Sequence, residues 1–298
     1  MPDPRATGAD LRAPAALAAL DGLGLGRVEV LDEVGSTNEH LAAAAVRRHR
    51  GAADGPRPDR PWADLSLVVA GHQSAGRGRL DRVWTTEPGT ALTFSLLLRP
   101  ADDRGRALPT QHFPWLTLLM AVAVVEALEG LAGVDARIKW PNDVHVDGRK
   151  LSGLLAGLVA DGDRPPAVVL GTGINVGQEE LPVATATSVR RATGRSVERS
   201  AVLAAVLAAF VPLYRCFCAD PSTVGPGGAI RARITARMET LGRSVRAELP
   251  GGRAPVVGTA VGLGEHGGLL VRDAAGAGHE VTAGDVVHLR PAPAAAED

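Results

Sequence analysis

The sequence predicts an α+β protein in which a region of mixed strands and helices precedes a small all-β domain. Short Val- and Leu-rich runs bounded by Gly and Pro predict strands, and three long apolar runs predict helices. Beyond Gly242 the pattern changes to short strands separated by glycines. The 298 residues suffice for two unequal domains. We expect an N-terminal extension (1–26), a large domain (27–241), a β-domain (242–291) and a tail (292–298).

The large domain is expected to open with a strand followed by a helix. RVEVLDEV, residues 27–34, alternates apolar and polar side chains and predicts the strand. STNEHLAAAAVRRHR follows, and Ser36 with Glu39 matches a capping box before an alanine run that favours helix. The Gly- and Pro-rich residues 51–64 predict a surface loop.

The rest of the large domain alternates strand and helix signals. GHQSAGRGRLDRVW, residues 71–84, predicts no packed element because glycines and arginines dominate it. Asp147-Gly148 predicts a tight hairpin. Strands are expected at residues 65–71, 91–100, 136–140, 143–146, 150–159 and 166–176. Helices are expected at residues 116–133, 200–217 and 228–242.

The C-terminal part predicts a small barrel. Strand patterns cover residues 244–250, 256–273 and 279–290, with glycines at the turns. About fifty residues is a usual size for such a module.

Composition excludes several functional classes. A net charge of −1 and a pI near 6.7 lack the basic footprint of general nucleic-acid binding. Cys216 and Cys218, the only cysteines, fit neither a disulfide framework nor a zinc site, and we expect two buried, inert thiols. The N-terminus lacks a secretory signal, and the longest apolar run, Leu116 to Leu128, contains Glu126. A cytoplasmic protein with no membrane partner is expected.

Two residue types are rare enough to mark places for chemistry. Lys139 and Lys150 are the only lysines, beside thirty arginines, and they lie in IKWPNDVHVDGRK. The only asparagines are Asn38 in STN, Asn142 in PND and Asn175 in GIN. A chain that has replaced Lys and Asn elsewhere indicates that these positions require an amine or a carboxamide.

Each motif also has a purely structural interpretation. GRGR, from Gly76 to Arg79, can cradle a phosphate or carboxylate, or can be a solvated loop. Ser36 can cap a helix without a ligand, and Asn175 can satisfy a strand end. GTGINVG is a weak match to a dinucleotide fingerprint, and no Walker A loop occurs.

Together, in this order, STN, GHQSAGRGRLDRVW, KWPNDV, GRKLSGLL and GTGINV resemble the biotin protein ligases over residues 27–291. The resemblance implies a mixed central sheet flanked by helices, like class II synthetases, and a C-terminal SH3-like barrel. It implies a ligase that forms biotinyl-AMP from biotin and ATP and transfers biotin to a lysine of a biotin carboxyl carrier protein domain. Acyl-CoA and pyruvate carboxylases carry such domains. About 26 residues precede the first strand, which we expect to be too few for the DNA-binding domain of ligases that double as repressors.

The same resemblance assigns roles to individual residues. Lys150, Arg79 and Asp143 are implied to be catalytic, with Asp143 orienting the incoming lysine. The residues implied for biotin are Ser36, Thr37, Asn38, Gln73, Arg77, Gly78, Arg79, Lys150 and Gly153. Those implied for ATP are Arg77, Arg79, Arg82, Trp84, Asn142, Lys150 and Asn175. Mg²⁺ is the expected metal, and its ligands are left unassigned.

Two competing functions remain open at this point. A lipoate-attaching ligase acts on the same kind of carrier lysine, and a biotin-dependent DNA-binding regulator needs no catalysis. The intact GRGR and KWPND motifs disfavour the first, and the near-neutral charge disfavours the second. Whether the chain forms a homodimer is also left open.

Overall fold

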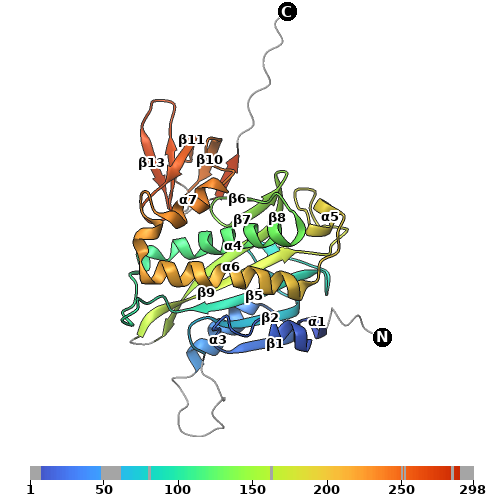
Figure 1. Ribbon diagram of the computed structural model, residues 1–298. Helices are drawn as coiled ribbons and strands as arrows, with labels where there is room; N and C mark the ends of the chain where they lie inside the picture. Colours follow the sequence, from blue (N-terminus) through green and yellow to red (C-terminus); the bar gives the residue numbers. More distant parts are fainter. Residues whose placement is uncertain are drawn as a thin grey trace, which may run out of the picture.

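A seven-stranded mixed sheet forms the centre of the protein (Figure 1). The computed structural model describes residues 8–47, 62–79, 82–161, 164–249, 251, 253–282 and 285–288. The strand order is β1 (Val28–Val34), β2 (Ser66–Gln73), β5 (Ala91–Leu98), β9 (Arg164–Asn175), β8 (Arg149–Asp161), β7 (Asp143–Val146) and β6 (Arg137–Lys139). Only the β1–β2 pair in this sheet is parallel. The expected mixed sheet is thus confirmed.

Helices cover both faces of this sheet. Helices α4 (Pro114–Ala132) and α6 (Arg199–Ala219) lie side by side across one face (Figure 1) and share its core with Leu67 and Val69 of β2. On the opposite face α3 (Thr37–Arg47) buries Leu41 against Val68. Successive β2 residues point to opposite faces, so burial on both sides explains the continuous apolar run of this strand.

Within the described residues, two helical segments are long and apolar enough to span a bilayer by length and composition alone, residues 110–132 and 199–219. Both are packed in the core: 72% and 56% of their apolar windows are buried inside the protein. Helices buried in this way are the core helices of a folded domain.

The N-terminal residues pack onto the sheet. Helices α1 (Ala9–Arg12) and α2 (Pro14–Ala18), which the sequence did not predict, precede β1. Leu11 and Leu20 are buried in the main core. The described part of the expected extension therefore contributes to the core of the large domain.

Some expected elements differ in extent. The prediction of no packed element at residues 71–84 is wrong, because β2 continues to Gln73 and β3 (Gly76–Arg77) pairs with β4 (Val83–Trp84). The last helix of the large domain, α7 (Ala229–Ala236), is shorter than expected, and α5 (Val189–Thr193) was not expected. Cys218 is buried as expected, but Cys216 is exposed. Most of the expected loop (51–61) and the whole tail (292–298) lie outside the described residues.

The C-terminal domain is an antiparallel five-stranded sheet of the SH3-like kind. Its order is β13 (Gly278–Val281), β12 (Leu269–Arg272), β11 (Val256–Leu263), β10 (Ser244–Glu248) and β14 (Asp285–His288). The two longer runs predicted from sequence each contain two strands, β11 and β12 in the first, separated by a turn at residues 265–266, and β13 and β14 in the second.

The small domain shares its core with the large one. Val245, Ala260 and Leu269 belong to the same apolar cluster as α4 and α6. Trp115 Nε1 donates to the Glu265 carbonyl at 2.9 Å, and Trp140 Nε1 donates to the Gly267 carbonyl at 3.0 Å. Arg231 donates to the Leu263 carbonyl. The barrel is therefore fixed against α4, α7 and the turn between β6 and β7 that carries Trp140.

Candidate active site

One cavity of about 690 Å³ collects every residue for which the sequence implied a role. Its walls come from the start of α3, the end of β2, the β3–β4 hairpin, strands β6 to β9 and residues 181–186. The predicted residues that line it are Ser36, Thr37, Asn38, Gln73, Arg77, Gly78, Arg79, Arg82, Trp84, Asn142, Asp143, Lys150, Gly153 and Asn175. Segments more than 130 residues apart along the chain thus meet at one site.

The polar end of the cavity is a hydrogen-bonded cluster at the start of α3. The backbone N–H and the hydroxyl of Thr37 donate to Gln73 Oε1 at 2.8 and 2.9 Å. Ser95 Oγ lies 2.8 Å from Thr37 Oγ1 and 2.6 Å from Asn38 Oδ1. Asn38 Nδ2 donates to the Leu155 carbonyl at 3.0 Å. These bonds fix the side chains before any ligand binds, which is what selective recognition of a small polar group requires.

The helix start itself follows the predicted capping pattern. Glu39 N–H donates to Ser36 Oγ at 3.4 Å, a long bond. In a full capping box the Glu39 carboxylate would accept from the Ser36 backbone N–H. Here it pairs instead with Arg77 Nε at 3.0 Å, so only half of the predicted box forms. The two side chains are exposed by 58% and 67%, so this pair contributes little to stability.

Lys150 and Asp143 form an ion pair in the lining of the cavity. Lys150 Nζ lies 2.7 Å from Asp143 Oδ1, and the two side chains are 34% and 19% exposed. A bulge interrupts the β7–β8 pairing between Val144 and His145, so Lys150 pairs with His145 while Ser152 pairs with Val144. Bulges of this kind redirect side chains beside active sites.

The backbone of Lys150 is fixed from the other side. Its N–H donates to the Thr185 carbonyl, and its carbonyl accepts from Thr187 N–H, both at 2.8 Å. Residues 181–186 thereby become a wall of the cavity. Sequence reasoning did not assign this segment to the site, because its Ala- and Thr-rich composition carries no chemical signal.

The β3–β4 hairpin holds the arginine-rich wall. Gly78 N–H donates to the Arg82 carbonyl at 2.7 Å. Arg79 Nη1 donates to Asn142 Oδ1 at 3.3 Å, and Asn142 Nδ2 donates to the Leu154 carbonyl at 2.7 Å. The guanidinium of Arg79 is therefore directed across the cavity toward the β6–β7 turn.

The Trp84 indole packs against two glycines, Gly153 and Gly173. A Cβ atom at Gly173 would lie 2.7 Å from Trp84 Cε2, and one at Gly153 would lie 3.4 Å from Trp84 Cζ3. Lys150 Nζ lies 5.9 Å from the centre of the indole, within range of a cation–π interaction. The glycines thus permit a flat aromatic wall beside the charged pair.

Both polar atoms of the Asn175 side chain form hydrogen bonds within the protein. Its Nδ2 donates to the Thr187 carbonyl and its Oδ1 accepts from Gln178 Nε2, both at 2.9 Å. The side chain is 4% exposed. These contacts favour the structural interpretation of the GIN asparagine, which fixes the segment leading to Thr187.

Two lining residues with ionisable side chains had no role assigned from the sequence. His145 is 7% exposed, and its Nδ1 lies 3.1 Å from Glu239 Oε1, on the chain that leads into the barrel. Lys139 lines the cavity beside Asn142. Nothing in DVHV distinguishes a site histidine from a strand histidine, so no sequence signal could have found His145.

The described residues contain no group of three or more His, Cys, Asp or Glu side chains placed to hold a metal ion. Within the cavity Asp143 is the single carboxylate among the lining residues of the described chain. Such a donor set suits an ion that takes most of its ligands from a substrate and from water.

Comparison with known proteins identifies the class to which this fold and cavity belong. The family model described as "Biotin/lipoate A/B protein ligase family" matches residues 49–175, and "Biotin protein ligase C terminal domain" matches residues 240–289. A Mycobacterium tuberculosis protein named "Biotin--[acetyl-CoA-carboxylase] ligase" is 34% identical over 274 residues, covering 90% of this chain and 91% of the relative. The chain belongs to the biotin protein ligase family.

Other relatives agree in fold and differ in length. "Biotin protein ligase from Aquifex aeolicus in complex with biotin and ATP" superimposes with a TM-score of 0.69 at 29% identity, covering 89% of this chain and 99% of that one. The Bacillus spizizenii "Bifunctional ligase/repressor BirA" is 37% identical over 211 residues, 69% of this chain. This chain matches only 61% of the length of that relative.

Proposed function

We propose that this chain is an ATP-dependent ligase that activates biotin as biotinyl-AMP and attaches it to a lysine of a biotin carboxyl carrier protein domain. The observation that carries the proposal is the single cavity whose lining holds the Lys150–Asp143 pair, the Thr37–Gln73 cluster and Arg79. The relatives' names supply the substrates: biotin and ATP in the Aquifex complex, and a carboxylase in the Mycobacterium ligase.

In the first step a biotin carboxylate oxygen attacks the α-phosphorus of ATP, and the bond to pyrophosphate breaks. Two anions approach each other, so the step needs fixed positive charge. Lys150, Arg77 and Arg79 provide it from the cavity walls. The Thr37–Gln73 cluster is suited to the ureido end of biotin, because it offers prearranged polar groups.

In the second step the ε-amine of the carrier lysine attacks the activated carbonyl, AMP leaves, and the amine loses a proton. The sequence implied that Asp143 orients this amine. Asp143 is already paired with Lys150, so we propose that it first holds the Lys150 ammonium in place. The incoming amine would then compete for the same carboxylate.

ATP normally enters such sites with Mg²⁺, which supplies charge neutralisation on the phosphates. Asp143 is the cavity carboxylate that could contribute to holding it. Arg82, Trp84 and Asn142 are proposed to line the nucleotide side, while Asn175 shapes this side through its contact with Thr187. We further propose a cytoplasmic protein that acts on carrier domains of acyl-CoA or pyruvate carboxylases without DNA or a membrane.

The test is to incubate the protein with ATP, Mg²⁺, labelled biotin and a purified carrier domain, and to follow covalent label by mass spectrometry. A parallel reaction with lipoic acid and a lipoyl domain covers the other acid named by the matching family model. We expect label on the carrier lysine in the biotin reaction and no transfer in the lipoic acid reaction. Transfer of lipoate alone, or of neither acid, would contradict the proposal.

A further inference from the structure

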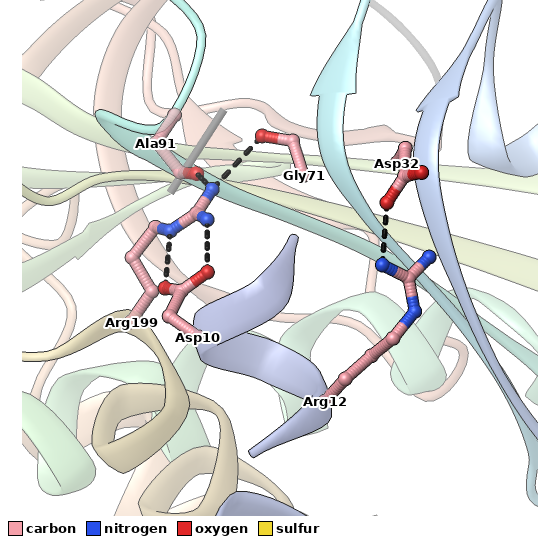
Figure 2. Close-up of polar contacts among 6 residues, drawn as sticks. All are labelled: Asp10, Arg12, Asp32, Gly71, Ala91 and Arg199. Atoms are coloured by element: carbon pink, nitrogen blue, oxygen red, sulfur yellow. Dashed lines mark hydrogen bonds and ion pairs between the residues drawn. The ribbon is translucent and has the colours of Figure 1, made fainter. Parts of the chain in front are cut away.

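A single buried guanidinium joins three segments that are distant in sequence (Figure 2). Arg199, the first residue of α6, is only 3% exposed. Its Nε and Nη2 donate to the two carboxylate oxygens of Asp10 on α1 at 3.0 and 2.6 Å. A buried arginine requires such a bidentate partner, because an uncompensated buried charge is strongly destabilising.

The same guanidinium bonds two backbone carbonyls where two strands separate. Arg199 Nη1 donates to the Gly71 carbonyl at 2.9 Å and to the Ala91 carbonyl at 3.0 Å. The pairing of β2 with β5 ends at Ala70 and Thr93, one residue from Gly71 and two residues from Ala91. Arg199 thus supplies hydrogen bonds where the strand ladder no longer does, as buried backbone carbonyls require.

Residues 72–90 connect Gly71, next to the end of the β2–β5 pairing, to the start of β5 at Ala91, and within them residues 72 and 73 still pair with β1. This segment carries Gln73, the β3–β4 hairpin with its arginines, and Trp84, which together form one side of the cavity. The Arg199 side chain therefore fixes both ends of this segment, at Gly71 and Ala91. Neither Arg199 nor Asp10 lines the cavity itself.

Helix α1 reaches this junction through close backbone contact. Gly8 has a φ of 68°, and a Cβ atom there would lie 3.1 Å from the Leu31 carbonyl oxygen and 3.4 Å from Gly71 Cα. Arg12 provides a separate anchor by bonding Asp32 (Figure 2). It also donates to the Val30 carbonyl at 2.8 Å. Loss of the Asp10 contact would thus leave α1 attached at Arg12.

We propose that Asp10 and Arg199 are positioning residues that fix the two ends of residues 72–90, where β2 and β5 separate, and thereby set how tightly the cavity holds its substrates. The identity of those substrates rests on the proposed function, whereas the anchoring of residues 72–90 does not. The N-terminal segment, far from the reacting groups, then becomes part of substrate binding.

The test compares amide hydrogen exchange in the full-length, ligand-free protein. Arg199→Lys keeps the charge but replaces a planar fork by a compact ammonium that cannot serve the carboxylate and both carbonyls equally well. Asp10→Asn removes the charge partner, and Arg12→Ala is the matched control on α1. In the first two variants we expect about tenfold faster exchange in peptides from residues 72–79 and 82–90, with α4 unchanged. The control should match wild type in those peptides.

Substrate binding supplies the second readout. The KM for biotin and ATP should rise about tenfold in Arg199→Lys while kcat changes less than threefold, since the reacting groups are untouched. Unchanged exchange at residues 72–90, or equally faster exchange throughout the chain, would overturn the proposal. Should wild type fail to use biotin, the proposed function falls while the exchange data still judge the anchor.

A variant that does not fold need not end the test. The double substitution Asp10→Leu with Arg199→Met removes both charges together, which proteins often tolerate in a core. It also removes the donor to the Gly71 and Ala91 carbonyls. Faster exchange confined to residues 72–79 and 82–90 supports the proposal, and wild-type protection there refutes it.

Discussion

Lys150 Nζ lies 2.7 Å from Asp143 Oδ1, across a bulge that brings the lysine opposite His145 rather than into the regular register. The Asp143 carboxylate therefore holds the ammonium, and Thr185 and Thr187 hold the backbone of Lys150, before any substrate arrives. A charge that is already oriented need not reorganise during reaction, which is the basis of electrostatic catalysis.

Lys150→Ala should reduce adenylate formation by a factor of about 10² to 10³, the loss typical of removing one preorganised donor. Pyrophosphate release in the absence of carrier measures this step. Lys139→Ala is the matched control, because it removes the other lysine from the same cavity. Equal losses in both variants would show that total charge, and not the position of Lys150, matters. Normal adenylate formation by Lys150→Ala would contradict the assignment outright.

Gly173→Ala should displace the Trp84 indole, because the new Cβ would lie 2.7 Å from Cε2 of that ring. We expect the KM for ATP to rise about tenfold with a smaller change for biotin, as for loss of a binding contact. Gly157→Ala on β8 is the control, since no atom lies within 4 Å of its Cβ position. An unchanged KM for ATP would contradict the proposal that Trp84 lines the nucleotide side of the cavity.

Truncation after Gly242 should abolish turnover and lower the unfolding temperature, because the barrel residues Val245, Ala260 and Leu269 belong to the core of the large domain. Removal of residues 292–298 alone serves as the control and should leave both properties intact. Circular dichroism melts and carrier labelling measure the two effects. Wild-type turnover of the truncated chain at every carrier concentration would make the barrel an independent appendage.

Arg79→Gly should form the adenylate but release it early, because the guanidinium that reaches across to Asn142 is lost. Free biotinyl-AMP acylates bystander lysines, so label on added albumin should rise about tenfold or more relative to wild type. Arg104→Gly, at an exposed loop position outside the cavity, is the control. Negligible albumin label with normal adenylate formation would show that Arg79 does not retain the intermediate.

The two thiols should differ in reactivity. Burial raises the pKa of the Cys218 thiol to about 11, whereas Cys216 is exposed. At pH 8 only about one Cys218 in a thousand is the reactive thiolate, and its reaction should accelerate as pH rises toward this pKa. A disulfide-exchange titration of the native protein should therefore show one fast thiol, absent in Cys216→Ser. Two equally fast thiols would contradict the burial of Cys218.

The sequence predicted the central elements and the site residues for different reasons. Strands such as β2 carry their own signal, because burial on both faces demands an unbroken apolar run. Lys150 and Asn142 could be found because the rest of the chain had lost these residue types. Ser95 could not be found: it lies in an apolar strand, and its contacts with Thr37 and Asn38 exist only after the chain folds.

The contrast between local sequence signals and contacts made only in the folded chain also explains why some elements were not predicted. The β3–β4 hairpin was missed because its stability comes from neighbours such as Gly173 and not from its Gly- and Arg-rich residues. Helix α1 spans only four residues, and the partner that fixes Asp10 lies 189 positions away. Local patterns cannot predict contacts of that separation.

Where the large domain meets the barrel, Trp115, Trp140 and Arg231 all donate to carbonyls of the barrel backbone, and none of these bonds uses a barrel side chain. Every residue type provides such a carbonyl, so substitutions at Leu263 or Glu265 leave the acceptors in place. Gly267 is restricted in type by its φ of 80°, and Leu263 by its burial in the shared core. Barrels from distant relatives that keep the shared apolar residues should therefore be transplantable onto this chain, with their exposed side chains free to diverge while the joint keeps its geometry.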